Sequence, residues 1–357
     1  MSAVAAGDSE QSREKHVTVQ QHVEDQSRTG VRPRVAVTFG DPAGVGPELI
    51  AKLLAQPRTT QVADLLLISD EEEIAAAGAD AGVQIEYTTE PVPGKPLLHP
   101  TRGIRPAGGF VRQQATAEGG RWALDALATA LDLANSGEVD AILFASLNKT
   151  SLHLAGMTEN DELHWFEKVL GADGFTCEVN VIPGLMTSRV SSHVSIAEVD
   201  ELITPERVEG ATRLLHSMLS ANHASPKIAV CALNPHAGEG GAFGRHEIDV
   251  IAPTVQRLRE EGLDVHGPFP SDTIFLRART DEFDGVVTMY HDQGQIAMKL
   301  IGFDKGVTIA GGLRVPICTP AHGSAFDIVG KGLANLGATQ HAFDLAVSIG
   351  AGVRAGR

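Results

Sequence analysis

The sequence predicts an α/β protein built on mostly parallel sheet. Short apolar runs of strand length alternate along the chain with segments of helical periodicity, a pattern typical of βαβ units. Polar or glycine-rich loops follow directly after several of these runs, which is where ligands bind in open α/β sheets. With 357 residues, 43% of them hydrophobic, the chain is long enough for two domains or for one large α/β unit.

The first strand is expected at residues 34–40, and it leads into the glycine-rich turn of residues 41–48. Pro47 suits the first position of a helix, and Glu48 suits the positive end of that helix. The turn lacks the G-x-G-x-x-G spacing and no P-loop lysine follows it, so neither nucleotide-binding fingerprint is assigned. A tight turn that merely joins two elements is the alternative.

The remaining elements continue the alternation. Strands are expected at residues 63–69, 83–88, 140–145, 228–233, 285–288 and 307–309. Helices are expected at residues 71–77, 116–134, 205–219, 247–261 and 295–301, in a segment that begins within 319–326, and at 338–349. Residues 91–109 are rich in proline and glycine without periodicity, which indicates a long surface excursion.

Charge and composition argue against several classes of protein. The net charge of −16, with no basic run, argues against a nucleic-acid partner but not against an anionic small molecule. No apolar stretch approaches the roughly 20 residues that span a bilayer, and the polar N-terminus lacks the apolar core of a signal peptide. We therefore expect a disordered tail over residues 1–33, no membrane partner and a cytoplasmic location. Three cysteines in separate apolar runs are predicted to be buried free thiols, namely Cys177, Cys231 and Cys318.

Three histidines lie in short polar loops next to predicted strands. His236 lies in the glycine-rich segment of residues 234–241, His291 in a similar segment of residues 290–294, and His193 in a third loop. Neutral imidazoles of this kind would suit a catalytic divalent ion that polarises a substrate oxygen. Their separations are far longer than those of zinc fingers or H-E-x-x-H sites, so each could instead be a polar residue at the base of a loop.

Lys299 and Asp272 are further candidates for catalysis. Lys299 lies one or two helical turns beyond His291, where it could act as a fixed cation or a proton donor. The alternative for Lys299 is a solvated helix face. Asp272 ends a rigid, proline-rich turn, and its alternative is a helix N-cap or turn acid.

Taken together, these segments resemble the 4-hydroxythreonine-4-phosphate dehydrogenase (PdxA) family. The similarity runs in order from Arg34 to the final helix and rests on several long motifs. They are GDPAGVGPE at residues 40–48, NK at 148–149, AG at 155–156, NPHAGEGG at 234–241, GPFPSDT at 267–273, YHDQG at 290–294 and HGSA at 322–325.

The resemblance implies an NAD- or NADP-dependent dehydrogenase that uses a divalent metal such as Zn, Mg or Co. It also implies a two-domain fold similar to isocitrate and isopropylmalate dehydrogenases, with the active site in the interdomain cleft. Such enzymes are homodimers whose active site is shared between subunits. We expect a first α/β domain over residues 34–155 and 305–357, and a second α/β domain, with the metal ligands, over 156–304. Because the family lacks the Rossmann fingerprint, no cofactor-binding residue is assigned.

Five functional residues of the family map onto identical residue types in this chain. Its three metal-binding histidines fall on His193, His236 and His291. The acid that each subunit contributes to its partner's site falls on Asp272, and the substrate-binding lysine falls on Lys299.

The expected phosphate pocket departs from the family pattern. Where the family has Gly-His-Thr-Glu, residues 161–164 of this chain read Asp-Glu-Leu-His, so the phosphate-binding His-Thr pair becomes Glu162-Leu163. The family's substrate-binding Asn becomes Thr308, and its Arg falls on Ile317, with Arg314 close by as a replacement.

These changes disfavour a phosphorylated substrate. A carboxylate next to a phosphate dianion costs about 1 kcal/mol or more at short range, even with partial screening. Losing an arginine also removes a bidentate clamp. We therefore predict a small-molecule hydroxy-acid substrate that need not carry a phosphate, bound by Glu162, Leu163, His164, Thr308 and Arg314.

The expected reaction is the metal-assisted oxidation of a secondary alcohol in a hydroxy acid, followed by decarboxylation. Relatives in the resembled family suggest two alternative activities. One is that of a cis-dihydrodiol dicarboxylate dehydrogenase of aromatic degradation, and the other is that of a dehydrogenase of phosphorylated sugar acids. Two other classes stay open. One is a metal-dependent hydrolase or aldolase that uses the same three histidines, and the other is a non-catalytic sugar-acid sensor.

Overall fold

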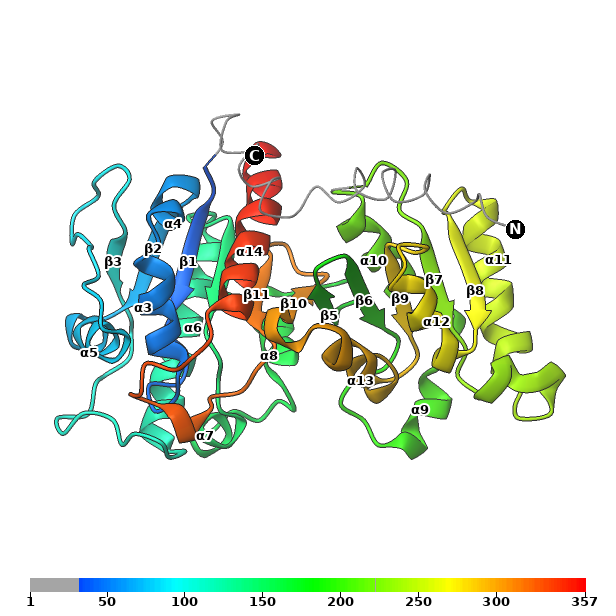
Figure 1. Cartoon of the computed structure of the whole chain (residues 1–357), viewed down its shortest axis with the longest axis horizontal. Coiled ribbons are helices and arrows are strands. Elements are labelled where there is room, and N and C mark those ends of the chain that lie inside the picture. Colours follow the sequence, from blue (N-terminus) through cyan, green and yellow to red (C-terminus); the bar gives the residue numbers. More distant parts are fainter. Residues whose placement is uncertain (1–31, 222) are drawn as a thin grey trace, which may run out of the picture. The chain divides into compact units, whose positions relative to one another are not determined.

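The computed structural model describes residues 32–221 and 223–357, which form two compact units (Figure 1). The first unit contains residues 32–180 and 298–357, and the second contains residues 181–297 apart from Asn222. The predicted disordered tail, residues 1–33, lies outside the described residues except for its last two positions. Both units are α/β, as the alternation of apolar runs predicts.

The sheet of the first unit has the strand order β3-β2-β1-β4-β11-β10. Its strands are β1 (Arg34–Thr38), β2 (Asp64–Ser69), β3 (Leu97–Pro100), β4 (Ala141–Phe144), β10 (Val307–Gly311) and β11 (Ile317–Pro320). Neighbouring strands pair in parallel except β10 and β11, which are antiparallel. The residues that follow β4 and β11 therefore lie at the same edge of the sheet.

Seven α-helices belong to the described part of the first unit. They are α3 (Gly46–Leu54), α4 (Pro57–Val62), α5 (Glu71–Ala81), α6 (Ala117–Asn135), α7 (Lys149–Leu154), α8 (Glu162–Leu170) and α14 (Gly337–Ala355). Helix α6 begins after Thr116, whose side chain accepts the Gly119 N–H, and it buries Leu127 and Leu131 against the sheet. The core of this unit thus forms from the apolar faces of its helices and the buried strands β1 and β4.

The sheet of the second unit has the order β6-β9-β7-β8, and all three of its strand pairs are parallel. Its strands are β6 (Leu185–Arg189), β7 (Ile228–Cys231), β8 (Val265–Phe269) and β9 (Gly285–Thr288). Its helices are α9 (Ile196–Leu202), α10 (Pro205–Leu219), α11 (Ala252–Glu260), preceded by the π-helical turn Glu247–Ile251, and α12 (Ser271–Ala278). Strand β5 (Cys177–Ile182) and helix α13 (His291–Gly302) contain the two points where the chain passes between units.

The structure divides the chain at residues 180/181 and 297/298, whereas the sequence suggested 155/156 and 304/305. The difference arises mainly from α8, which packs into the first unit. Its Leu163, Phe166 and Leu170 belong to the same buried cluster as Leu131 of α6 and Phe144 of β4. Residues 156–180 therefore fold with the first unit.

Two predicted elements are wrong. Residues 83–88 form no strand, and only Thr88 joins the sheet, through a single bridge to Leu97 of β3. Strand β3, which pairs with β2, lies inside the segment predicted to be an irregular excursion. No α-helix begins within residues 319–326. The start of that segment belongs to β11, and Ala325 has a left-handed backbone (φ 42°) ahead of the short 3-10 turn Phe326–Ile328.

Cys177, Cys231 and Cys318 are buried free thiols, as predicted. Burial raises the pKa of Cys231 and Cys318 well above the usual thiol value, which keeps both protonated. In the described ranges no helix combines the length and the apolar character needed to cross a membrane.

Candidate functional site

Three histidine-bearing loops lie at one edge of the second unit's sheet. His193 follows β6, His236 follows β7 and His291 follows β9. Because these strands are mutually parallel, their carboxyl ends meet at the same edge. Asp272 belongs to this edge as well, since it lies in the first turn of α12 directly after β8, and its side chain is exposed.

Hydrogen bonds join the three loops to one another. Ser191 donates from its N–H (3.1 Å) and its hydroxyl (2.8 Å) to the carbonyl of Met289. The Met289 N–H donates to Oε1 of Gln293 at 2.7 Å, and Nε2 of Gln293 donates to the carbonyl of Ala232 at 2.8 Å. The loops after β6, β9 and β7 are thereby held in a fixed relation.

His193 and His291 are neighbours in this arrangement. Their ring centroids are 5.5 Å apart, and Nδ1 of His291 lies 2.6 Å from a carboxylate oxygen of Asp292. Burial is the main reason why the pKa of His291 is lowered, although the hydrogen bond to Asp292 opposes the shift. With Nδ1 donating to Asp292, the neutral ring presents Nε2 as a lone-pair donor, the form that binds a metal.

His236 lies in an unusual left-handed turn. Residues 236–240 all have positive φ, including three that are not glycine: His236 (52°), Ala237 (52°) and Glu239 (43°). Left-handed helical geometry costs each non-glycine residue roughly 1–2 kcal/mol. Strain of this kind persists only where the surrounding structure enforces it, and it is common at functional sites.

The buried carboxylate of Glu247 supplies that enforcement. It accepts the N–H groups of Leu233 (2.9 Å) and Asn234 (2.7 Å) and the side-chain amide of Asn234 (3.1 Å). Burial opposes ionisation, but these hydrogen bonds outweigh it and lower the pKa of Glu247. A Cβ on Gly238 would lie 2.6 Å from Oε2 of Glu247, so the turn packs directly on this carboxylate.

The chemistry of the three histidines fits a divalent metal ion. All three are imidazole donors at one sheet edge, and the tautomer of His291 is set by its hydrogen bond. Among the described residues of this unit, no three histidine, cysteine or acidic side chains have ligand atoms all within 4.8 Å of one another. The structure thus brings His193 and His291 together and places His236 on its own strained turn. Lys299 is exposed on α13.

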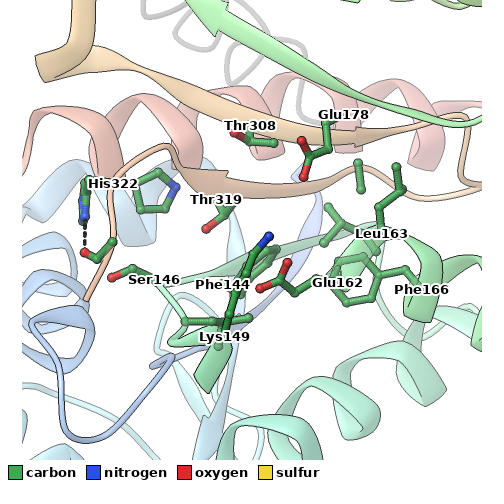
Figure 2. Close-up of a pocket in the computed structure, with 15 residues that line it drawn as sticks. Phe144, Ser146, Lys149, Glu162, Leu163, Phe166, Glu178, Thr308, Thr319 and His322 are labelled. Atoms are coloured by element: carbon green, nitrogen blue, oxygen red, sulfur yellow. Dashed lines mark hydrogen bonds between the residues drawn. The ribbon is translucent and has the colours of Figure 1, made fainter. Parts of the chain in front are cut away.

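The first unit contains a cavity of about 320 Å³ beyond the ends of β4 and β11 (Figure 2). The cavity is lined by four residues that differ from the family pattern, namely Glu162, Leu163, Thr308 and Ile317. His164 and Arg314, which were also predicted to bind the substrate, do not line the cavity. Nδ1 of His164 is 2.6 Å from Asp161, and Arg314 donates to the carbonyl of Leu170 at 3.0 Å.

Two buried polar atoms of the cavity wall have no hydrogen-bond partner among the described residues. They are the hydroxyl of Ser146, which is only 3% exposed, and Nε2 of His322. Nδ1 of His322 lies 3.0 Å from the carbonyl of Gly323 and therefore carries the proton, which leaves Nε2 as an acceptor. Buried polar atoms without partners are uncommon and indicate a place where a ligand supplies them.

The N-terminus of α8 reaches this cavity in a form that suits anions poorly. Asp161 caps the helix by accepting the N–H of His164 at 3.0 Å, and it is almost fully buried. Glu162, the next residue, points its carboxylate into the cavity near Lys149 and Glu178 (Figure 2). Burial raises the pKa of Glu162; the charge of Lys149 opposes this shift and that of Glu178 adds to it.

The opening GDPAGVGPE motif supports the loop that carries His322. The Val45 N–H donates to the carbonyl of Ser324 at 3.0 Å, and a Cβ on Gly44 would lie 2.7 Å from the Ser324 side chain. Asn148 donates from its side chain to the Ser324 hydroxyl at 3.3 Å. Three motifs that are distant in sequence therefore meet beside the cavity.

Several groups that the structure places in these sites have no role predicted from the sequence. Ser146, Glu178 and His322 line the cavity, and Glu247 holds the turn of His236. The signal available was their position, because Ser146 and His322 each come two residues after the end of a strand. The pairing of β4 with β11, which brings them together, is not visible in sequence.

Fold and site define a two-unit α/β protein with three histidine loops at the edge of one sheet and a polar cavity in the other unit. A model of the family described as pyridoxal phosphate biosynthetic protein PdxA matches residues 61–346. The chain belongs to this family, which confirms the resemblance seen in its motifs.

Known proteins are similar to this chain over most of its length. A Pseudomonas aeruginosa protein, "Putative 4-hydroxythreonine-4-phosphate dehydrogenase 2", is 53% identical over 330 residues, 89% of this chain and 97% of that protein. The crystal structure of 4-hydroxythreonine-4-phosphate dehydrogenase from Klebsiella pneumoniae gives a TM-score of 0.75 at 31% identity, covering 89% of this chain and 98% of that one. A terephthalate 1,2-cis-dihydrodiol dehydrogenase from Burkholderia xenovorans gives 0.63 at 28% identity, with the same coverage.

Proposed function

We propose that this protein is a metal-assisted dehydrogenase that oxidises a secondary alcohol in a hydroxy acid with NAD or NADP. The observation that carries the proposal is the set of histidine loops after β6, β7 and β9, in a chain whose relatives are named as dehydrogenases. His193, His236 and His291 would hold the ion, which we take to be Zn, Mg or Co. A bound ion would supply Lewis acidity to the reacting hydroxyl, and a bound nicotinamide would supply the hydride acceptor.

The residues of the chain have distinct roles in this proposal. Asp292 holds the His291 ring in its metal-binding tautomer, and Glu247 holds the turn that carries His236. Lys299 supplies a cation or a proton to the substrate, and Asp272 orients a cation or hydroxyl in the partner subunit's site. When the oxidised product is a β-keto acid, the bond between its α-carbon and its carboxylate carbon breaks and carbon dioxide leaves. The electron pair of that bond stays on the α-carbon, which takes a proton from Lys299.

We further propose that the protein is a homodimer, that it is located in the cytoplasm and that its substrate carries no phosphate. Support for the last point comes from the cavity. The N-terminus of α8 already has an anionic cap in Asp161, and the adjacent Glu162 is a second carboxylate. A phosphate dianion there would meet like charges in place of the donors that normally bind it. Glu162, Leu163 and Thr308 are therefore proposed as substrate contacts; His164 and Arg314, which line no part of the cavity, are proposed only as residues that support α8.

A second candidate is oxidation of a cis-dihydrodiol dicarboxylate. It is favoured by the structural likeness to a terephthalate dihydrodiol dehydrogenase, whose named substrate has no phosphate. The apolar side of the cavity, formed by Phe144, Leu163 and Phe166, would accept a carbocyclic ring. A phosphorylated sugar acid is the remaining alternative.

The test is a panel of hydroxy acids, cis-dihydrodiols and phosphorylated sugar acids assayed for NADH and NADPH formation with Zn, Mg and Co. The proposal predicts reduction of NAD or NADP by a non-phosphorylated compound, abolished by a chelator and restored by metal. Hydrolysis or aldol cleavage without nicotinamide reduction would contradict it in favour of the other metal-dependent class. Binding of a sugar acid with no turnover under any condition would favour the sensor.

A further inference from the structure

We propose that the cavity of the first unit binds a group with adjacent hydroxyls, a vicinal polyol, and that Glu162 is the residue that selects it. This inference rests on the proposed function and extends it to the chemical class of the substrate. It is carried by the balance of hydrogen-bond donors and acceptors in the cavity wall, together with the two unpartnered polar atoms found there.

Acceptors predominate in the wall. The carboxylates of Glu162 and Glu178 accept hydrogen bonds when ionised, and Nε2 of His322 accepts because the proton is on Nδ1. Of the lining side chains, Lys149 alone is restricted to donating. A ligand that complements this wall must therefore bring several donors of its own.

The hydroxyl side chains suit the same ligand. Thr308 already accepts a hydrogen bond from the side-chain amide of Asn180 at 3.0 Å, so its own proton can go to a ligand oxygen. The Ser146 hydroxyl and Thr319 can each donate and accept. An alcohol oxygen has the same dual capacity, so neighbouring hydroxyls of one ligand can pair with both kinds of group.

Charge favours a polyol over a phosphate group and over an ammonium group as the ligand of this cavity. A phosphate dianion brings acceptors without donors and would face two carboxylates against one ammonium. An ammonium group would be attracted by the carboxylates but repelled by Lys149, and it could not accept a hydrogen bond from Lys149 or from Thr308. Uncharged hydroxyls avoid both conflicts.

The shape of the cavity agrees with this assignment. Its volume of about 320 Å³ suits a small ligand. Phe144, Leu163, Phe166 and Ile317 provide apolar contacts. Figure 2 shows Leu163 and Phe166 at one end of the cavity, Ser146 and His322 at the other, and Lys149 and Glu162 between them. A carbon chain with hydroxyls can place its C–H groups on the apolar side and its O–H groups on the polar side.

Calorimetric binding to the full-length protein tests the proposal without requiring turnover. The probes are a four-carbon trihydroxy acid, its terminal phosphate ester, its deoxy analogue and its amino analogue. We expect the trihydroxy acid to bind at least about tenfold more tightly than the other three. Glu162→Gln should reduce that preference by about tenfold, because it replaces a charged acceptor with an amide. Glu118→Gln, which removes an exposed acid from the first turn of α6, should leave it unchanged.

Three outcomes would overturn the inference. They are tighter binding of the phosphate ester, tighter binding of the amino analogue, and an unchanged preference in a Glu162→Gln protein that folds normally by circular dichroism. Failure of the proposed function would look different. In that case the binding preference would hold, but none of the probes would reduce NAD or NADP in the metal-loaded protein.

Discussion

Glu73 is a buried acid of the first unit, and its surroundings shift its pKa. It accepts hydrogen bonds from the Ser69 hydroxyl (2.6 Å) and from the indole N–H of Trp122 (3.1 Å). Burial nevertheless dominates and raises the pKa of Glu73 from 4.5 to about 7. At neutral pH the folded protein therefore contains a buried carboxyl that is only partly ionised.

This shift predicts a specific effect of Glu73→Gln. Because the folded pKa is the higher one, the contribution of Glu73 to stability is fully present below 4.5 and is lost as the pH rises through about 7. A shift of this size corresponds to about 3 kcal/mol. Glu73→Gln should thus gain stability relative to the wild type as the pH rises through that window, as measured by urea unfolding followed by tryptophan fluorescence.

The difference in unfolding free energy between the wild type and Glu73→Gln cancels the titrating groups that the two proteins share, and so reports on Glu73. Glu72→Gln is the matched control, since Glu72 is an exposed acid in the same first turn of α5. A difference between wild type and Glu73→Gln that stays constant with pH would contradict the assignment.

At the scale of elements, the left-handed turn of residues 236–240 contains two glycines that respond differently to an added methyl group. Gly238 has a φ of 78°, and an added Cβ would lie 2.6 Å from Oε2 of Glu247. Gly240 has a φ of 63° in the same turn, but an added Cβ would meet nothing within 4 Å. The two glycines therefore separate backbone strain from packing.

Gly240→Ala should cost about 1–2 kcal/mol in the free energy of unfolding, the strain of a left-handed alanine. Gly238→Ala should cost this amount plus a further 1–3 kcal/mol or so for overpacking against Glu247. Urea unfolding of both variants measures the difference. Equal losses would show that the contact with Glu247 does not enforce the turn.

Elements with strong local signals were predicted well. Helix α10 occupies Pro205–Leu219, the predicted range, because Thr204 caps it, Pro205 suits its first turn and Val208, Ala211 and Leu215 form one apolar face. Strand β3 was missed because Leu97–Pro100 has no continuous apolar run and exists through its pairing with the edge of β2. The turn of His236 was predicted only as a glycine-rich loop, since its handedness depends on Glu247.

At the scale of the whole molecule, the sequence located loops but not the sites that they form. The positions of Glu162, Leu163 and Thr308 came from the family resemblance, and the structure places all three on one cavity wall. Ser146, Glu178 and His322 join them only because β4, β5, β10 and β11 bring distant residues together. Strand order is a long-range property, so no local pattern could have predicted it.

The proposed activity depends on a metal bound by His193, His236 and His291. The most direct measurement is the metal content of purified wild type, His236→Ala and the control His216→Ala, combined with NADH formation on the best substrate of the panel. We expect about one divalent ion per chain in the wild type and in the control. In His236→Ala we expect loss of both the ion and NADH formation. A His236→Ala protein that keeps its metal and its NADH formation would contradict the three-histidine site.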